Sequence, residues 1–273
     1  MIFGLLDQML IALPLFFGAY VTISLLKMPD FSLESAYLCG ALAGALTAHL
    51  PVGYAMLAGV GGGCFVALIV SLVAFRCKLP FLLAAIIVNG LCHGITQGIL
   101  GTSMRSVQMT LPFSEHAVLM VAGVMCACVM FFVLRSKLAY AWAAFGHNRQ
   151  FFECHAISGG FVKTSGIVVG YACAGLSGFL FSLSNGFVDL TMGFGVVLIC
   201  LTALTLGASV IRSAKPHFVV PIVGLVLFFS IQQTLLQLGL NLKYFNAFQA
   251  LVVLGAILFM ARKERRVIDH LGV

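Results

Sequence analysis

Charged residues are scarce in this 273-residue sequence. Only 8% of the residues are Asp, Glu, Lys or Arg, whereas 62% are hydrophobic and the mean hydropathy is +1.12. A soluble domain carries roughly 25% charged residues, so this composition excludes a single water-exposed globular domain. The net charge of +7 would suit nucleic acid, but the cations are dispersed along the chain instead of gathered in one patch. We therefore expect no nucleic-acid partner.

The motifs of several enzyme classes are also missing. No Gly-Lys dipeptide occurs, which excludes a Walker-type phosphate loop, and neither His-Glu-x-x-His nor Gly-x-Ser-x-Gly is present. The nine cysteines show no disulfide or zinc spacing, so we expect no metal site. The eight acidic residues lie near the ends of apolar segments or in loops, whereas intramembrane proteases and ion-coupled transporters usually need buried ionisable groups. The sequence predicts no catalytic residue and no enzyme activity.

In place of charged residues and enzyme motifs, the chain contains long apolar segments. About 20 apolar helical residues cross a hydrocarbon core, so we predict an all-α fold: a polytopic transmembrane helix bundle of about nine spans (eight to ten) that forms one domain, 1–273. Within 32–75, His49-Leu50-Pro51 suits either a tight hairpin or a break in a re-entrant segment. The predicted spans are approximately 8–26, 32–50, 52–75, 80–100, 116–134, 160–184, 194–211, 218–238 and 244–261.

The basic residues divide between the two sides of these spans. If the tail Arg262–Arg266 is cytoplasmic, 13 of the 15 Lys and Arg residues fall on the cytoplasmic side, and only Arg105 and Lys243 fall outside it. Because positively charged loops stay in the cytoplasm, we predict an external amino terminus and a cytoplasmic carboxyl terminus. Met1–Leu10 carries Asp7 and no cation, so we do not expect it to act as a cleavable signal peptide.

Glycines spaced four residues apart indicate close helix packing, because small residues let helix backbones approach in lipid. They occur as Gly40 and Gly44, Gly59 and Gly63, Gly166 and Gly170, and a ladder of Gly90, Gly94 and Gly98.

Two predicted spans also carry polar side chains on one face. Asn89, His93 and Gln97 are four residues apart, as are Gln233 and Gln237. Polar groups within a membrane need partners or water. Two interpretations stay open: these faces line a translocation path near the bundle axis, or they form interhelical hydrogen bonds worth about 1 kcal/mol each.

Two further segments stand out. Asp30 or Ser32 can cap the first turn of the second span, and Glu34 suits the positive end of that helix.

The long cytoplasmic loop, about 135–159, combines exposed aromatic residues that include Trp142 with a break at Gly146 and then an amphipathic segment. Exposed aromatic residues favour a protein interface, and a short helix lying along the bilayer is the alternative.

These segments resemble the permeases of bacterial ABC importers of the branched-chain amino acid and ribose type. The chain departs from that pattern at 151–154, where small residues are usual, and at Ala208, where a second glycine is usual. The similar segments are Pro29–Ser35 at the opening of the second span, Leu79–Leu82, Ala144–Gly159 in the cytoplasmic loop, Gly193–Gly195 and Leu206–Ala208.

The resemblance implies the translocation subunit of an importer in the bacterial plasma (inner) membrane. A second permease subunit, identical or different, would complete the path, and a solute-binding protein would deliver solute to the external segments 101–115 and 185–194. A cytoplasmic ABC ATPase dimer would hold ATP and Mg²⁺, so this chain needs no cofactor of its own. The residues expected to couple to the ATPase are Ala144, Phe145, Gly146, His147, Asn148, Arg149, Ile157 and Ser158.

The expected solute is small and polar, with an amino acid favoured and a sugar or nucleoside open. Two other functions were weighed. An ion-gradient-driven secondary transporter or channel would use the face of Asn89, His93 and Gln97 and would need no ATPase. A membrane enzyme is disfavoured because the sequence offers no nucleophile, acid pair or metal cluster.

Overall fold

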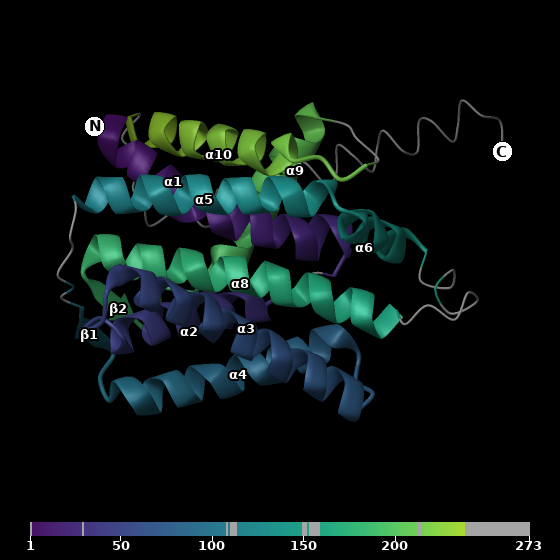
Figure 1. Cartoon of the computed structure of the whole chain (residues 1–273), viewed down its shortest axis with the longest axis horizontal. Coiled ribbons are helices and arrows are strands. Elements are labelled where there is room, and N and C mark those ends of the chain that lie inside the picture. Colours follow the sequence, from purple (N-terminus) through teal and green to yellow (C-terminus); the bar gives the residue numbers. More distant parts are fainter. Residues whose placement is uncertain are drawn as a thin grey trace.

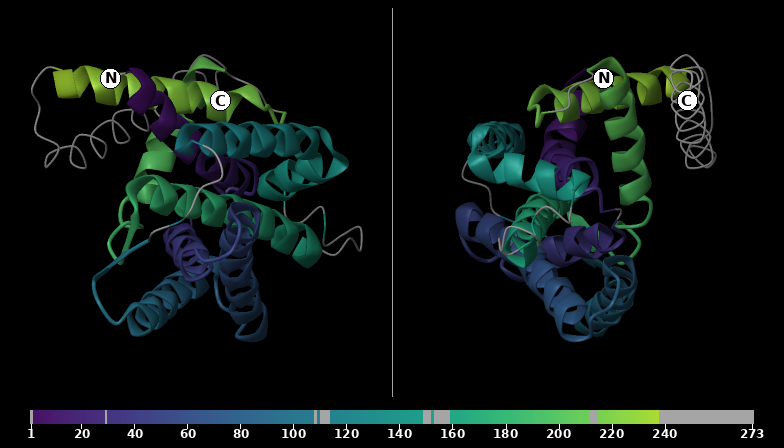
Figure 2. Two further views of the ribbon diagram at one scale, coloured as in Figure 1. Left: turned by 60° about the vertical axis from the view of Figure 1, so that its left-hand side comes forward. Right: turned by 90° about the vertical axis from the view of Figure 1, so that its right-hand side faces the viewer.

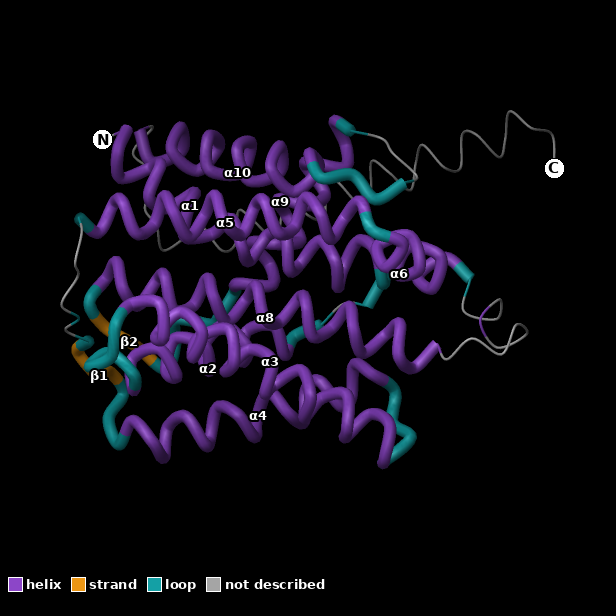
Figure 3. Tube along the Cα trace, viewed as in Figure 1, coloured by secondary structure: helices purple, strands orange, loops and turns teal. Residues whose placement is uncertain are grey.

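The computed structural model describes residues 2–28, 30–107, 109, 114–148, 152, 159–211 and 215–237. Within these residues the chain is all-α apart from one pair of short strands (Figures 1 and 3). In chain order the elements are α1 (Ile2–Ala19), the π-helix η1 (Tyr20–Leu25), α2 (Ser32–Leu46), α3 (Val52–Arg76), α4 (Phe81–Leu100), β1 (Met104–Ser106), α5 (Glu115–Arg135), α6 (Lys137–His147), α8 (Gly159–Asn185), β2 (Phe187–Asp189), α9 (Val196–Val210) and α10 (Val219–Gln237).

Six helical segments in the described part of the chain are long and apolar enough to cross a membrane. They are Gly4–Leu25 and the helices α3, α4, α5, α8 and α10. Two predicted spans are shorter than expected: α2 and α9 have 15 residues each, about 22 Å of helix, whereas the hydrocarbon core is about 30 Å thick. The predicted span 244–261 lies outside the described residues.

The segment 32–75 forms two separate helices, α2 and α3, which are joined by a short turn at 47–51. The Thr47 hydroxyl donates to the carbonyl oxygens of Ala43 (2.9 Å) and Gly44 (3.1 Å) where α2 ends. Pro51 directly precedes the first turn of α3, where its missing N–H removes no helical hydrogen bond. The second span therefore ends at residue 46 instead of residue 50.

Helix α8 is the central helix of the bundle, and α1, α2, α3 and α6 pack on it (Figure 1). Glycine makes this close packing feasible. A Cβ atom at Gly178 would overlap the carbonyl oxygen of Tyr37 on α2, and one at Gly63 would overlap the carbonyl oxygen of Tyr171 on α8. Backbones at such separations leave no room for a side chain, so glycine fixes the distances between α2, α3 and α8.

The glycine spacing in the sequence predicts close packing correctly for six of the nine glycines concerned. Gly40, Gly44, Gly59, Gly63, Gly166 and Gly170 all meet a neighbouring element. The ladder of Gly90, Gly94 and Gly98 on α4 differs, because a Cβ there would meet no atom within 4 Å among the described residues. Within this chain, then, the ladder is an open face of α4.

Helices α4 and α10 lie on opposite flanks of the bundle. α4 packs on α2 and α3, whereas α10 packs on α9 and α1, and the two further views in Figure 2 keep them apart. The two ends of the bundle also differ. β1 and β2 pair antiparallel, with Arg105 opposite Val188, at one end, and α6 lies at the other (Figure 1).

Candidate functional site

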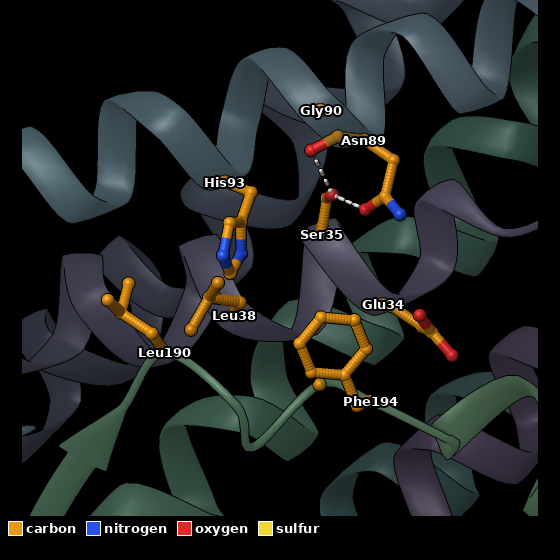
Figure 4. Close-up of a pocket in the computed structure, with 9 residues that line it drawn as sticks. Glu34, Ser35, Leu38, Asn89, Gly90, His93, Leu190 and Phe194 are labelled. Carbon is orange, nitrogen blue, oxygen red and sulfur yellow. Dashed lines mark hydrogen bonds between the residues drawn. The ribbon is translucent and has the colours of Figure 1, made fainter. Parts of the chain in front are cut away.

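A cavity of about 220 Å³ opens between α2, α4 and the segment that leads from β2 into α9 (Figure 4). Each of the three elements contributes three lining residues. They are Glu34, Ser35 and Leu38 from α2, Asn89, Gly90 and His93 from α4, and Leu190, Gly193 and Phe194 from the β2–α9 segment.

Ser35 and Asn89 join α2 to α4 at the cavity wall. The Ser35 hydroxyl donates to the side-chain oxygen of Asn89 and lies 3.4 Å from the Asn89 carbonyl oxygen (Figure 4). Ser35 itself is buried. Because the amide oxygen of Asn89 is taken by Ser35, its NH₂ group is left to donate hydrogen bonds. Ser35 and Asn89 thus hold α2 against α4 at the cavity wall.

Glu34 joins α2 to the start of α9. The backbone N–H of Gly195 donates to a carboxylate oxygen of Glu34 at 3.1 Å. Gly195 has φ +84°, a backbone conformation that glycine adopts without strain, and α9 begins at the next residue. The Glu34 side chain therefore stabilises the positive end of α9. Glu34 also lies in the first turn of its own helix, α2, as the sequence suggested.

Phe194 lies between two glycines and remains 66% exposed. Its ring centroid is 5.8 Å from that of His93 on α4. An aromatic side chain and an imidazole thus lie side by side at the cavity.

Asp30 lies deeper in the bundle than the sequence suggests. It is 1% exposed, and one carboxylate oxygen accepts hydrogen bonds from the Ser32 N–H (2.9 Å) and hydroxyl (2.6 Å). The Tyr171 hydroxyl donates to the other carboxylate oxygen. Tyr171 is near the middle of α8, a helix of 27 residues and about 40 Å. Asp30 does lie in the linker just before α2, as the sequence places it, but its carboxylate is buried against α8.

The two polar faces predicted from the sequence do not meet within this chain. Asn89 and His93 line the cavity, whereas Gln97 is exposed and does not line it. Gln233 is half-buried and Gln237 exposed on α10, which lies on the opposite flank (Figure 2).

The loop 135–159, predicted to be cytoplasmic, begins with a helix, α6. Trp142 was expected to be exposed, but it is fully buried, and its indole N–H donates to the Ser165 hydroxyl of α8 at 3.0 Å. Gly146 was expected to interrupt the helical structure of the loop, yet it lies within the last turn of α6. A Cβ there would overlap the carbonyl oxygen of Leu25 in η1, so glycine at this position permits close contact between α6 and η1.

Besides Gly146, which is half-buried, the predicted coupling residues divide into three groups. Ala144, His147 and Asn148 are exposed. Phe145 is buried, and its ring centroid lies 5.6 Å from that of Phe152. Arg149, Ile157 and Ser158 lie outside the described residues.

Sequence reasoning missed part of the cavity. Ser35, Leu38 and Leu190 line it but were not candidate site residues. The spacing of Glu34 and Leu38, four residues apart, does place them on one helix face, which is a usable signal. Nothing in the sequence indicates that this face meets Asn89 or the β2–α9 segment.

Comparison with known proteins agrees with this architecture. The chain is 24% identical over 272 residues to an uncharacterised protein of Rickettsia prowazekii (strain Madrid E), RP368, and the match covers 94% of each chain. No solved structure matches the chain. The model of a family described as "Branched-chain amino acid transport system / permease component" matches residues 1–259. The chain therefore belongs to this family of membrane permease subunits of ABC transporters.

Proposed function

We propose that this chain is the membrane-spanning subunit of an ABC importer in the bacterial plasma membrane. It would move a small polar solute, with an amino acid favoured by the description of its family, and a separate ATPase would supply the energy. The main support for this proposal is the position of α6, an 11-residue helix at one end of the bundle. Its Ala139 and Trp142 are buried, whereas Leu138 and Tyr140 are about half exposed. This arrangement suits a helix held by the permease on one face and by a partner on the other.

A series of packed segments leads from α6 to the cavity. Gly146 of α6 meets Leu25 at the end of η1, and η1 is a π-helix, an unusual geometry that often occurs at functional sites. The linker that follows carries Asp30, which is hydrogen-bonded to Ser32 at the start of α2. One turn further along, Ser35 of α2 is hydrogen-bonded to Asn89. Displacement of α6 by an ATPase would in this way move a wall of the cavity.

The ends of the bundle support the proposed orientation. The α3–α4 turn and the start of α6 lie at the same end (Figure 1), and this end receives Arg76, Lys78, Arg135 and Lys137. Positively charged segments stay in the cytoplasm, so we assign this end to the cytoplasm and the β1–β2 end, with the amino terminus, to the outside; the carboxyl terminus, which lies outside the described residues, is assigned to the cytoplasm from its basic residues alone. An external amino terminus and a cytoplasmic carboxyl terminus require an odd number of spans, and the nine predicted spans meet this requirement.

The remaining partners follow from this orientation. A solute-binding protein would dock at the β1–β2 end, and a second permease subunit, identical or different, would lie beside this chain. ATP and Mg²⁺ would bind to the ATPase dimer and not to this chain. Asn89 and His93 are the residues we place on the translocation path, because they line the cavity.

Substitution of Gly146 tests the coupling role of α6. Gly146→Ala forces α6 away from η1, and we expect ATP-driven uptake in membrane vesicles containing the ATPase and binding protein to fall at least tenfold. Gly160→Ala is the matched control, since a Cβ there meets no atom within 4 Å, and should leave uptake unchanged. Ala144→Cys, at an exposed site, should cross-link to the ATPase. Full uptake by Gly146→Ala at normal membrane levels would refute this coupling role, and uptake that needs an ion gradient and no ATP would refute the importer assignment.

A further inference from the structure

Three basic residues gather around the turn between α3 and α4. Arg76 is the last residue of α3 and Lys78 lies in the turn, and both are exposed. Lys163, near the start of α8, is half-buried. Its ammonium group lies 4.7 Å from the ring centroid of Phe81, the first residue of α4. Because Phe81 follows the turn directly, the charge of Lys163 lies at the same turn as the other two cations.

The packing of α3 on α8 explains why these cations meet. Gly59 of α3 approaches Gly175 of α8, and Gly63 approaches Tyr171. Residue numbers thus rise along α3 while they fall along α8, so the two helices run antiparallel. The last turn of α3 therefore lies beside the start of α8, at the same end of the bundle (Figure 1).

No exposed carboxylate neutralises the turn within the described part of the chain, where Arg76 and Lys78 form no ion pair. Asp30 does attract Lys163 electrostatically, but Asp30 is 1% exposed and so cannot balance the charge at the surface. The acidic residues that the structure describes are Asp30 and Glu34 at the beginning of α2, and Asp7, Glu115 and Asp189. Glu115 begins α5 and Asp189 ends β2, both at the opposite end of the bundle (Figure 1).

The backbone of Lys78 has an unusual conformation. Its φ is +51°, and it follows Cys77, the C-cap of α3. Glycine is the usual residue at this position, because an L side chain is strained there. A lysine keeps a positive charge at the turn where glycine would relieve the strain.

The surface beside the turn is apolar. Phe75 is 81% exposed and Leu72 62% exposed on α3, Leu82 is 43% exposed on α4, and Phe161 is 66% exposed at the start of α8. In a membrane protein such side chains contact the acyl chains of lipids. Cations at the end of a lipid-facing apolar surface match an anionic head group that carries its own acyl chains. A free phosphate ion would use the cations and leave the apolar surface uncovered.

We propose that an anionic phospholipid binds at the α3–α4 turn. Its phosphate lies among Arg76, Lys78 and Lys163, and its acyl chains cover the exposed apolar side chains of α3 and α4. The lipid then bridges the start of α8 and the start of α4, the helix that supplies three lining residues of the cavity. This site goes beyond the proposed function, since it requires neither an ATPase nor a particular solute.

A lipid titration tests the site. The purified full chain in an uncharged detergent is titrated with phosphatidylglycerol or with phosphatidylcholine of the same acyl chains, and bound lipid is counted by native mass spectrometry. We expect the first phosphatidylglycerol to bind at least tenfold more tightly than phosphatidylcholine, a difference of about 1.4 kcal/mol. Glycerophosphoglycerol, the same head group without acyl chains, should bind at least tenfold more weakly than phosphatidylglycerol.

The exposed thiol of Cys77 reports where the lipid binds, because it lies between the two cations of the turn. Phosphatidylglycerol should slow its alkylation by a water-soluble maleimide at least fivefold in the same detergent, whereas phosphatidylcholine should not. Alkylation at Cys77 that is unaffected by saturating phosphatidylglycerol would show that the lipid binds elsewhere.

Substitutions separate this site from a general attraction of anionic lipid to the basic end. Lys78→Gly removes a charge and suits the backbone at φ +51°, so the turn is retained; the preference for phosphatidylglycerol should fall at least threefold. With Arg76→Gln added, it should fall below twofold. Lys137→Gln is the matched control, since Lys137 is an exposed cation at the same end that lies at the start of α6, and it should keep the preference.

Several outcomes would overturn the proposal. It fails if the wild type binds the two lipids within twofold of each other, a comparison that needs no variant to fold. It also fails if the double variant keeps the preference, or if Lys137→Gln loses as much of it as Lys78→Gly. Equal binding of glycerophosphoglycerol and phosphatidylglycerol would indicate a site for soluble phosphate compounds and refute the lipid.

Discussion

Replacement of Tyr171 with phenylalanine tests whether Asp30 fastens the linker before α2 to the central helix. The Tyr171 hydroxyl donates to a carboxylate oxygen of Asp30, and both residues are at most 1% exposed. Without this hydroxyl, a carboxylate oxygen loses its donor at a site that water does not reach. Hydrogen bonds to charged groups contribute about 1.5–3 kcal/mol. We expect Tyr171→Phe to lower the free energy of unfolding by about 2 kcal/mol, and the Tm by about 4–8 °C.

The matched control is Tyr37→Phe on α2. Tyr37 is also buried, but its hydroxyl makes no hydrogen bond to a carboxylate in the described part of the chain, and its ring packs against Phe181. We expect its Tm to change by less than half as much as that of Tyr171→Phe. Unfolding can be followed with a thiol-reactive fluorophore, because Cys92 and Cys200 are buried in the folded chain and react only when it opens. Equal Tm changes for the two variants would show that the hydrogen bond to Asp30 contributes nothing specific.

Three further predictions concern packing and orientation. Gly178→Ala should destabilise the chain by about 1–3 kcal/mol, since its Cβ overlaps a carbonyl oxygen of α2, whereas Gly94→Ala on the open face of α4 should not lower the Tm of the isolated chain. The emission of Trp142, the only tryptophan, should be blue-shifted and resistant to iodide quenching because the ring is buried; emission typical of exposed indole would contradict the packing of α6. In intact cells, an impermeant thiol reagent should label Ser106→Cys and not His147→Cys, and the reverse pattern would invert the proposed orientation.

The candidate site shows where sequence reasoning works and where it stops. Asn89 and His93 could be found because polar residues four apart in an apolar helix are unusual and share one face. Their partners could not be found, since Ser35 on α2 and Phe194 before α9 are far away in the chain and follow no common period. Gln233 and Gln237 obey the same helical rule as Asn89, yet the packing of α10 on α9 and α1 places them on the other flank.

The sequence by itself determined that this chain is a helical membrane protein of the permease type. Scarce charge, long apolar segments and sided basic residues are local properties, and a bilayer imposes the same requirements on every segment that crosses it. Only the tertiary structure decided that Asp30 lies level with the middle of α8, that Trp142 is buried, and that Glu34 stabilises the start of α9. Each of these depends on how closely two distant segments approach, and that distance is fixed by glycines and side-chain volumes on both segments together.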